Sequence, residues 1–213
     1  MKITWLGHSC YLLENSNEVS LAIDPFDPSI GYDAPTVKAD LVTTSHDHHD
    51  HNAVDQLMGD PKVISKKDPI EVLGFNIKGI SSYHDDDKGN KRGENIIFIY
   101  DVDNLRIVHL GDLGHMLDKD KITSLGKVDI LFVPVGSVYT IDGEQANELV
   151  KKISPTVTIP MHYKTPKLNI DLRPVDDFLN LADEYQQLNT NEVEITTNNI
   201  NSFAPIVVLQ PPK

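Results

Sequence analysis

The chain has 213 residues, 39% of them hydrophobic, and a formal net charge of −13. This length suits one domain over residues 1–213, or two halves that share a core. The acidic excess argues against a broad surface for nucleic acid or an anionic membrane. No apolar run approaches the ~20 residues of a membrane helix, no signal segment precedes the first predicted strand, and the single Cys10 fits a reducing compartment. We therefore expect a cytoplasmic protein with a small-molecule substrate, and the sequence leaves a homo-oligomer open.

The first quarter of the chain consists of short apolar runs separated by turns, which is typical of β-strands. Gly7-His8 and residues 14–18 separate the first runs, and Asp24-Pro25 ends a later one. The pattern predicts strands over residues 3–6, 10–13, 19–23 and 39–44. A short helix is predicted over residues 53–58, because the following Gly59-Asp60-Pro61 would end it.

The remaining chain continues with strands and then alternates strands with helices. Strands are predicted over residues 69–80, 96–100, 105–110, 129–133 and 156–160. Asp142 is predicted to cap a helix that runs to about residue 153, and apolar spacing predicts another helix over residues 175–188. Residues 85–93 are polar and contain glycine, which predicts a loop, and its first part, Asp85-Asp86-Asp87-Lys88, is predicted to be solvated. This order favours a layered fold of the α/β or α+β class.

The densest cluster of reactive side chains is the segment His46-Asp47-His48-His49-Asp50-His51, with the pattern His-x-His-x-Asp-His. Imidazoles and carboxylates are ligands that zinc, manganese and iron accept. The segment follows the predicted strand 39–44, and α/β proteins usually place their chemistry on loops at strand ends. Structural zinc sites are usually closed and rich in cysteine, so this donor set favours a catalytic metal site.

Three later segments also place histidine or aspartate at the end of a predicted strand. They contribute His84, the pair His109 and Asp112, and His162. Side chains at the ends of adjacent strands can meet at one edge of a sheet. Because two metals about 4 Å apart need more ligands than the first segment provides, these residues are candidates to complete the site.

These motifs resemble the metallo-β-lactamase superfamily. Four segments are similar to its small single-domain branch of metal-dependent hydrolases: Trp5-Leu6-Gly7-His8-Ser9, Ile23-Asp24-Pro25-Phe26, His109-Leu110-Gly111-Asp112-Leu113-Gly114-His115 and Ile159-Pro160-Met161-His162-Tyr163. Characterised relatives of that branch include an ascorbate-phosphate lactonase and the N-acyl-phosphatidylethanolamine phospholipase D group. The resemblance implies an α/β fold, a four-layer αββα sandwich with its site in a cleft at one edge of the two sheets.

The resemblance also implies seven metal ligands in two groups that share one carboxylate: His46, His48 and His84 for the first metal, Asp50, His51 and His162 for the second, and Asp112 between them. Asp50 and Asp112 are the candidate catalytic residues. Asp50 could pass a proton to the leaving group in addition to binding the second metal. His109, although close to Asp112 in sequence, is expected to be a neighbour of the site and not a ligand.

Six further residues are candidates to orient ligands or to contact the substrate: His8, Asp24, His109, His115, Tyr139 and Lys164. His8 and Asp24 either orient ligands or serve only the turns in which they lie. His109 is expected to donate a hydrogen bond beside the site. His115, Tyr139 and Lys164 follow site-bearing strands, so they either contact the substrate or are ordinary loop residues.

The resemblance implies a hydrolase with two divalent metal ions, with zinc expected and manganese or iron as the other candidates. A hydroxide that bridges the metals would attack a small ester, lactone, amide or phosphodiester, because metal-bound water can have a pKa of about 7. Two alternatives remain on the same fold, a di-iron redox protein and a non-catalytic metal-binding module. Iron content with a redox response would identify the first, and a metal-loaded protein without hydrolytic activity would identify the second.

Overall fold

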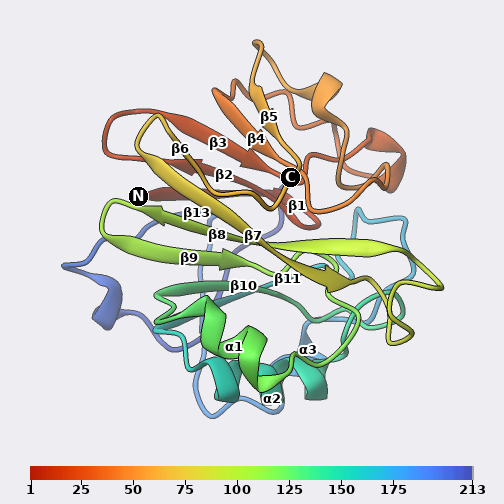
Figure 1. The fold of residues 1–213 in the computed structure, drawn as a ribbon. Helices are drawn as coiled ribbons and strands as arrows, with labels where there is room; N and C mark the ends of the chain where they lie inside the picture. The colour runs from red at the N-terminus through yellow and green to blue at the C-terminus, as the bar shows by residue number, and fades with distance from the viewer. Residues whose placement is uncertain (213) are drawn as a thin grey trace.

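The computed structural model describes residues 1–212 as two facing six-stranded β-sheets and a small two-stranded sheet (Figure 1). The first large sheet, in the order β13-β1-β2-β3-β4-β5, contains β1 (Lys2–Gly7), β2 (Cys10–Glu14), β3 (Ser20–Ile23), β4 (Leu41–Thr43), β5 (Lys62–Ile64) and β13 (Glu192–Glu194). The second, in the order β11-β10-β9-β8-β7-β6, contains β6 (Ile70–Val72), β7 (Phe75–Tyr83), β8 (Glu94–Val102), β9 (Leu105–His109), β10 (Ile130–Pro134) and β11 (Val157–Met161). The small sheet pairs β12 (Gln186–Gln187) with β14 (Val207–Val208).

Apolar side chains from both large sheets fill the space between them. The rings of Tyr11 on β2 and Phe132 on β10 lie with centroids 4.2 Å apart. The hydroxyls of Thr43 on β4 and Tyr100 on β8 form a hydrogen bond of 2.8 Å across the same space. Each fully buried large apolar side chain contributes about 2 kcal/mol of transfer free energy. This shared core fixes the position of one sheet relative to the other. The strand ends that meet at one edge are therefore held in place as well.

Three helices cover the outer face of the second sheet: α1 (Lys119–Leu125), α2 (Gly143–Ile153) and α3 (Asp176–Leu179) (Figure 1). The predicted cap of α2 is confirmed, because Asp142 and Gln145 each accept a hydrogen bond from the other's backbone amide. Loops and the 3₁₀ turns Pro28–Ile30 and Val54–Gln56 cover the first sheet, so its outer layer has no α-helix within residues 1–212. None of the helices described for these residues is long and apolar enough to cross a bilayer.

Two predicted helices are wrong in extent. Residues 53–58 form only a 3₁₀ turn, because the backbone amide of Met58 donates to Val37 O and ends the turn in an extended pairing. The helix predicted over residues 175–188 ends after Leu179. The amides of Gln186 and Leu188 instead donate to Ile206 O and Val208 O, so pairing with β14 prevails over local helical spacing.

Two other elements differ from the predicted boundaries. Residues 69–80 are not one strand, because Leu73 and Gly74 have positive φ values of 48° and 83° and turn the chain between β6 and β7. This two-residue turn suits the twist of an antiparallel hairpin. Helix α1 was not predicted, although Asp118 caps it by accepting a hydrogen bond of 2.8 Å from the amide of Lys121.

Strand direction brings the predicted site segments to one edge. In the first sheet β1, β3 and β4 run in the same direction, and in the second sheet β7, β9 and β11 do so. The residues that follow these six strands are therefore placed together: His8, Asp24, the segment from Ser45 to His51, His84, Asp112 and His162.

Candidate metal centre

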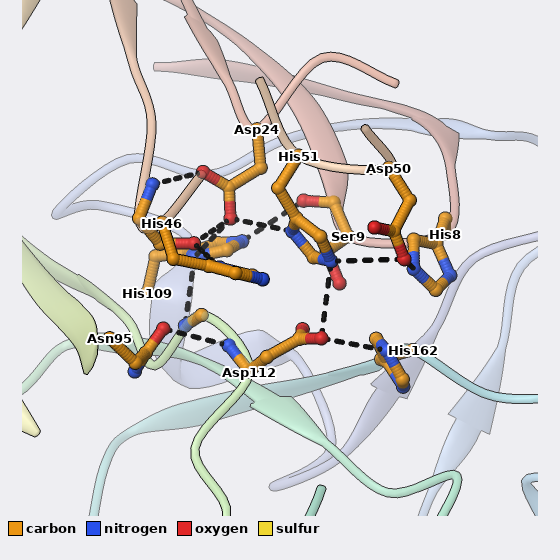
Figure 2. Close-up of polar contacts among 12 residues, drawn as sticks. His8, Ser9, Asp24, His46, Asp50, His51, Asn95, His109, Asp112 and His162 are labelled. Carbon is orange, nitrogen blue, oxygen red and sulfur yellow. Dashed lines mark hydrogen bonds and ion pairs between the residues drawn. The ribbon is translucent and has the colours of Figure 1, made fainter. Parts of the chain in front are cut away.

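Three histidines surround one carboxylate at this edge. The Nε2 atoms of His51, His84 and His162 lie 3.2, 3.3 and 3.1 Å from Oδ2 of Asp112. Figure 2 shows two of these histidines, His51 and His162, approaching the Asp112 side chain from different directions. These side chains come from both sheets, so the tertiary fold and not one local motif assembles them.

The donor atoms fall into overlapping groups that fit metal coordination. Donor atoms of His46, His48 and His84 all lie within 4.8 Å of one another, and the same limit holds for His46, His51 and Asp112. Another such group contains His8, Asp50, His51 and His162. The residues predicted as ligands from the sequence are therefore all brought together, and their groups share His46 and His51.

Several of these atoms are buried without a protein partner. Within residues 1–212, Nε2 of His46, Nε2 of His51 and Oδ1 of Asp112 form no hydrogen bond. A buried polar atom without a partner costs about 1–3 kcal/mol, and imidazole nitrogen and carboxylate oxygen are donors that divalent metals accept. The residues present therefore fit a metal centre, which would satisfy atoms that the protein alone does not.

Asp24 orients the histidines of both groups. The backbone amide and Oγ of Ser45 donate to its carboxylate at 2.7 and 2.6 Å, and Nδ1 of His51 donates to it at 3.0 Å. Because the Ser45 hydroxyl donates to Asp24, it accepts from Nδ1 of His46 at 2.9 Å. Both rings thus direct Nε2 into the site (Figure 2). Asp24 was among the candidates from the sequence, but Ser45 was not. The role of Ser45 depends on its place between Asp24 and His46.

Replacing Asp24 with asparagine is expected to lower metal affinity by about 10- to 100-fold, because His51 and Ser45 lose their charged acceptor. Competition with a chromogenic chelator measures the change. The matched control is Asp27→Asn, because the Asp27 carboxylate accepts from the Ser29 amide at 2.9 Å in the next loop. Equal metal affinity in the Asp24 variant, the control and the wild type would contradict the orienting role.

Asn95 positions the backbone of Asp112 and was not predicted from the sequence. Its Nδ2 donates to Ser82 Oγ and Leu110 O at 2.7 and 2.9 Å, and its Oδ1 accepts from the Asp112 amide at 3.0 Å. Asn95 is 1% exposed, so all three contacts are shielded from water. An asparagine at the start of a strand has no distinctive spacing in the sequence, and only strand pairing reveals this role.

His109 has no free ring nitrogen for a metal. Its Nε2 donates to Ser9 O at 3.0 Å, and its Nδ1 accepts from the Gly111 amide at 3.1 Å. The side chain is fully buried, and Figure 2 shows it behind His46 and Asp24. His109 therefore ties the end of β9 to the turn after β1, next to the donor group.

The other three candidates serve the surrounding loops. His115 accepts from the Tyr83 amide at 3.3 Å and donates to Met116 O at 2.9 Å, so both of its nitrogens are engaged. Nζ of Lys164 donates to the carbonyls of Leu168 and Ile170 at 2.6 and 2.9 Å. Tyr139 is 37% exposed, with the Arg92 guanidinium carbon 5.3 Å from its ring centroid. None of these contacts points the side chain into the donor group.

A cleft of about 650 Å³ adjoins the donor group on the side of His46 and His48. Its walls come from both sheets and from residues 85–93, and they include polar and apolar side chains, among them Asn52, Arg92 and Ile96. Cavities of this volume accommodate small molecules. The donor group is thus adjacent to a space in which a small substrate fits.

The prediction that residues 85–88 are solvated is wrong for Asp85. Asp85 is 2% exposed. Its Oδ1 accepts from the amides of Asp87 and Gly89, and its Oδ2 accepts from those of Lys91 and Arg92, at 2.7–3.0 Å. Burial raises the pKa of Asp85, but these amides lower it by more, to about 2. One carboxylate beside His84 therefore shapes the loop that carries Arg92 to the cleft.

Replacing Asp85 with asparagine is expected to open this loop, because an amide has one acceptor oxygen for four backbone donors. Amide hydrogen exchange over residues 87–92 should become roughly tenfold faster or more. The control is Asp86→Asn, whose side chain is 75% exposed and pairs only with Lys91 Nζ at 2.6 Å. Equal exchange in both variants would refute this role.

Two glycines permit the close packing of the loops that carry His84 and His162. A Cβ on Gly114 would collide with the backbone of His84 and Asp85, and one on Gly136 would collide with the carbonyl of His162. Three other residues at the site, His8, Asp24 and His162, have φ values of 52°, 47° and 52°. Left-handed backbone is uncommon for non-glycine residues, and such conformations concentrate at functional sites.

Comparison with known proteins agrees with this fold and with a metal-dependent hydrolase. A model of the beta-lactamase superfamily domain matches residues 2–162. A UPF0173 metal-dependent hydrolase from Archaeoglobus fulgidus is 32% identical, and the match covers 78% of this chain and 84% of that protein. A UPF0173 metal-dependent hydrolase from Desulforamulus reducens is also 32% identical and covers 78% and 85%.

Solved structures give the same assignment. The crystal structure of a candidate Zn-dependent hydrolase of the metallo-β-lactamase superfamily from Thermotoga maritima has a TM-score of 0.83 and 38% identity and covers 99% of both chains. An isothiocyanate hydrolase from Delia radicum gut bacteria has a TM-score of 0.66, covers 98% and 96%, and is 14% identical, which shows likeness of fold alone. The chain therefore belongs to the UPF0173 family of metal-dependent hydrolases within the metallo-β-lactamase superfamily.

Proposed function

We propose that this chain hydrolyses a small ester, lactone, amide or phosphodiester with two divalent metal ions, zinc being the expected metal. The observation that carries the proposal is the approach of three histidine Nε2 atoms to within 3.1–3.3 Å of one buried Asp112 oxygen. Such a set has enough donors for two metals and lacks the cysteine that closes structural zinc sites. The ascorbate-phosphate lactonase-like branch, which the sequence motifs resemble, makes lactone and phosphodiester substrates the first to test.

The proposed ligands are His46, His48 and His84 for one metal, Asp50, His51 and His162 for the other, and Asp112 for both. When bound, the metals would polarise a carbonyl or phosphoryl oxygen and make water nucleophilic near neutral pH. The protein's own contribution is to fix the donor atoms. Asp24 does so for His51 and, through Ser45, for His46, and Asn95 does so for Asp112.

Asp50 is the proposed proton acceptor. Burial raises the pKa of Asp50, but the neighbouring His51 and His8 lower it by more, so its carboxylate is charged at neutral pH. In this charged form, the oxygen of Asp50 that does not hold the metal could accept a proton from attacking water and deliver it to the leaving group. A small substrate is favoured because the adjoining cleft measures about 650 Å³.

The test combines metal analysis with hydrolysis assays on the purified full chain. Metal content per chain is measured, together with turnover of bis(p-nitrophenyl) phosphate and a panel of small lactones, with and without added zinc or manganese. Two metals per chain with turnover of one substrate class would support the proposal and select the chemistry. A chain that holds no metal under any loading condition would overturn it, and redox-active iron without hydrolysis would favour the di-iron alternative.

A further inference from the structure

We infer that His8 is an eighth protein ligand of this centre and binds the second metal through Nε2. This inference rests on the proposed binuclear site, to which it adds a donor from the turn between β1 and β2. The donor atoms of His8, Asp50, His51 and His162 all lie within 4.8 Å of one another. With His8, the second metal would have more protein ligands than the first.

The His8 ring is buried beside the other donors and lacks a partner of its own. His8 is 1% exposed, and neither ring nitrogen has a hydrogen-bond partner in the part of the chain that the structure describes. Buried imidazoles are normally hydrogen-bonded or bound to a metal. His109, which is also buried, is of the first kind, because both of its ring nitrogens are hydrogen-bonded. The unpaired His8 ring instead fits binding to a metal.

The contact with Asp50 has the geometry of two donors around a common centre. Nε2 of His8 lies 3.3 Å from Oδ2 of Asp50, yet the two atoms are not aligned as a hydrogen bond. The rings of His8 and His162 are tilted by 41° with centroids 4.3 Å apart. Figure 2 shows His8 beside Asp50, facing the same interior as His51 and His162. A residue that only positioned Asp50 would be expected to align its N–H with the carboxylate.

The backbone holds His8 at this place independently of any metal. The carbonyl of His8 accepts hydrogen bonds from Trp5 Nε1 at 3.0 Å and from the amide of His162 at 3.3 Å. The turn before it is made by Gly7 and by the left-handed φ of 52° at His8 itself. The carbonyl contact links the position of His8 directly to that of His162, a residue of the same donor group.

The experiment removes the imidazole and follows the metals by means other than activity. His8→Gly suits the left-handed backbone, so the turn is preserved. Wild type and variant are loaded with cobalt(II), desalted, and compared by metal content, visible absorption and competition with a chelator. The matched control is His49→Ala, because His49 also lies near Asp50, at 3.9 Å, but its side chain is 68% exposed. A His48→Ala variant, which alters the proposed first site, provides the reference for loss of the other metal.

We expect the wild type and His49→Ala to retain two metals. His8→Gly should bind the second metal at least about tenfold more weakly, with a changed cobalt spectrum that differs from that of His48→Ala. Added imidazole should restore the second metal in His8→Gly. The metal-free His8→Gly and wild-type chains should melt at similar temperatures, which a purely structural role would not allow.

Two results overturn the inference in distinguishable ways. If the wild type holds two metals and His8→Gly holds both with unchanged affinity and spectrum, His8 is not a ligand while the binuclear site stands. If the wild type itself holds fewer than two metals, the proposed site fails and the role of His8 fails with it. Should His8→Gly not fold, His8→Asn gives the same readouts, because asparagine tolerates left-handed backbone and lacks the imidazole nitrogen that zinc accepts.

Discussion

Replacing Asp112 with asparagine is expected to remove most of the bound metal and to lower kcat/KM by at least about 10²- to 10³-fold. The substitution keeps the shape of the side chain but removes its charge and replaces one oxygen by an N–H donor. Three histidine Nε2 atoms lie within 3.1–3.3 Å of the present oxygen. The histidine nitrogens around Asp50, the other carboxylate of the donor group, lie farther away, at 3.3, 3.7 and 3.9 Å, so the loss should exceed that from any ligand-orienting residue.

The control for Asp112→Asn is Asp118→Asn, six residues further along the same segment. Asp118 is exposed and caps α1 through the Lys121 amide, so its loss should cost about 1 kcal/mol of stability and leave the metals in place. Metal content by elemental mass spectrometry and kcat/KM on the identified substrate are measured for both variants. An Asp112→Asn chain with two metals and wild-type turnover would remove Asp112 from the proposed centre.

The fold was predictable where strand signals were strong and where each strand ended in a distinctive motif. Strands close to β1, β2, β3, β9 and β11 follow from apolar runs bounded by turn residues, and the helix capped by Asp142 follows from its capping residue. The two wrong helices share one cause. Residues 53–58 and 175–188 have helical patterns, but their backbones pair with distant segments, and local spacing contains no information about that pairing.

Some residues of the site could likewise be predicted from the sequence, and others could not. Candidate donors could be named in advance because histidines and aspartates follow the predicted strands, and the resemblance to the metallo-β-lactamase superfamily then selected seven of them as expected ligands. Ser45 and Asn95 could not, because their roles consist of contacts between segments that are far apart in the sequence. His109 shows the opposite difficulty. It lies three residues before Asp112, and only its hydrogen bonds to Ser9 and Gly111 show that its nitrogens are engaged.

Removing the metals with a chelator is expected to lower the melting temperature, by an amount that grows as the pH rises above 6.5. Binding to the native state alone stabilises a protein by about 4 kcal/mol when free metal is 1,000-fold above its Kd. For a chain of this size, that corresponds to a shift of roughly 10 °C. The buried donors without partners give the physical reason, because they are satisfied only when a metal is bound.

The pH dependence follows from His51. Burial lowers the pKa of His51, but the carboxylates of Asp112, Asp50 and Asp24 raise it by more, to well above its usual 6.5 in a chain without metal. Because the folded pKa exceeds the unfolded one, this stabilisation is fully present below pH 6.5 and is lost as the pH rises through the folded pKa. Metal binding needs the neutral ring, so binding releases a proton and tightens over the same range. The melting curves of the two forms should therefore separate further with rising pH.

Melting temperatures of the loaded and chelated chains between pH 6.5 and about pH 8.5 measure this separation, and calorimetry in buffers of different ionisation enthalpy measures the released proton. The control is the chelated His51→Gln chain, whose stability should no longer fall over this range, because the titrating ring is absent. A chelated wild-type chain that becomes more stable from pH 6.5 upward would refute the proposed protonation of His51. A constant gap between loaded and chelated chains would show that metal binding does not compete with this proton.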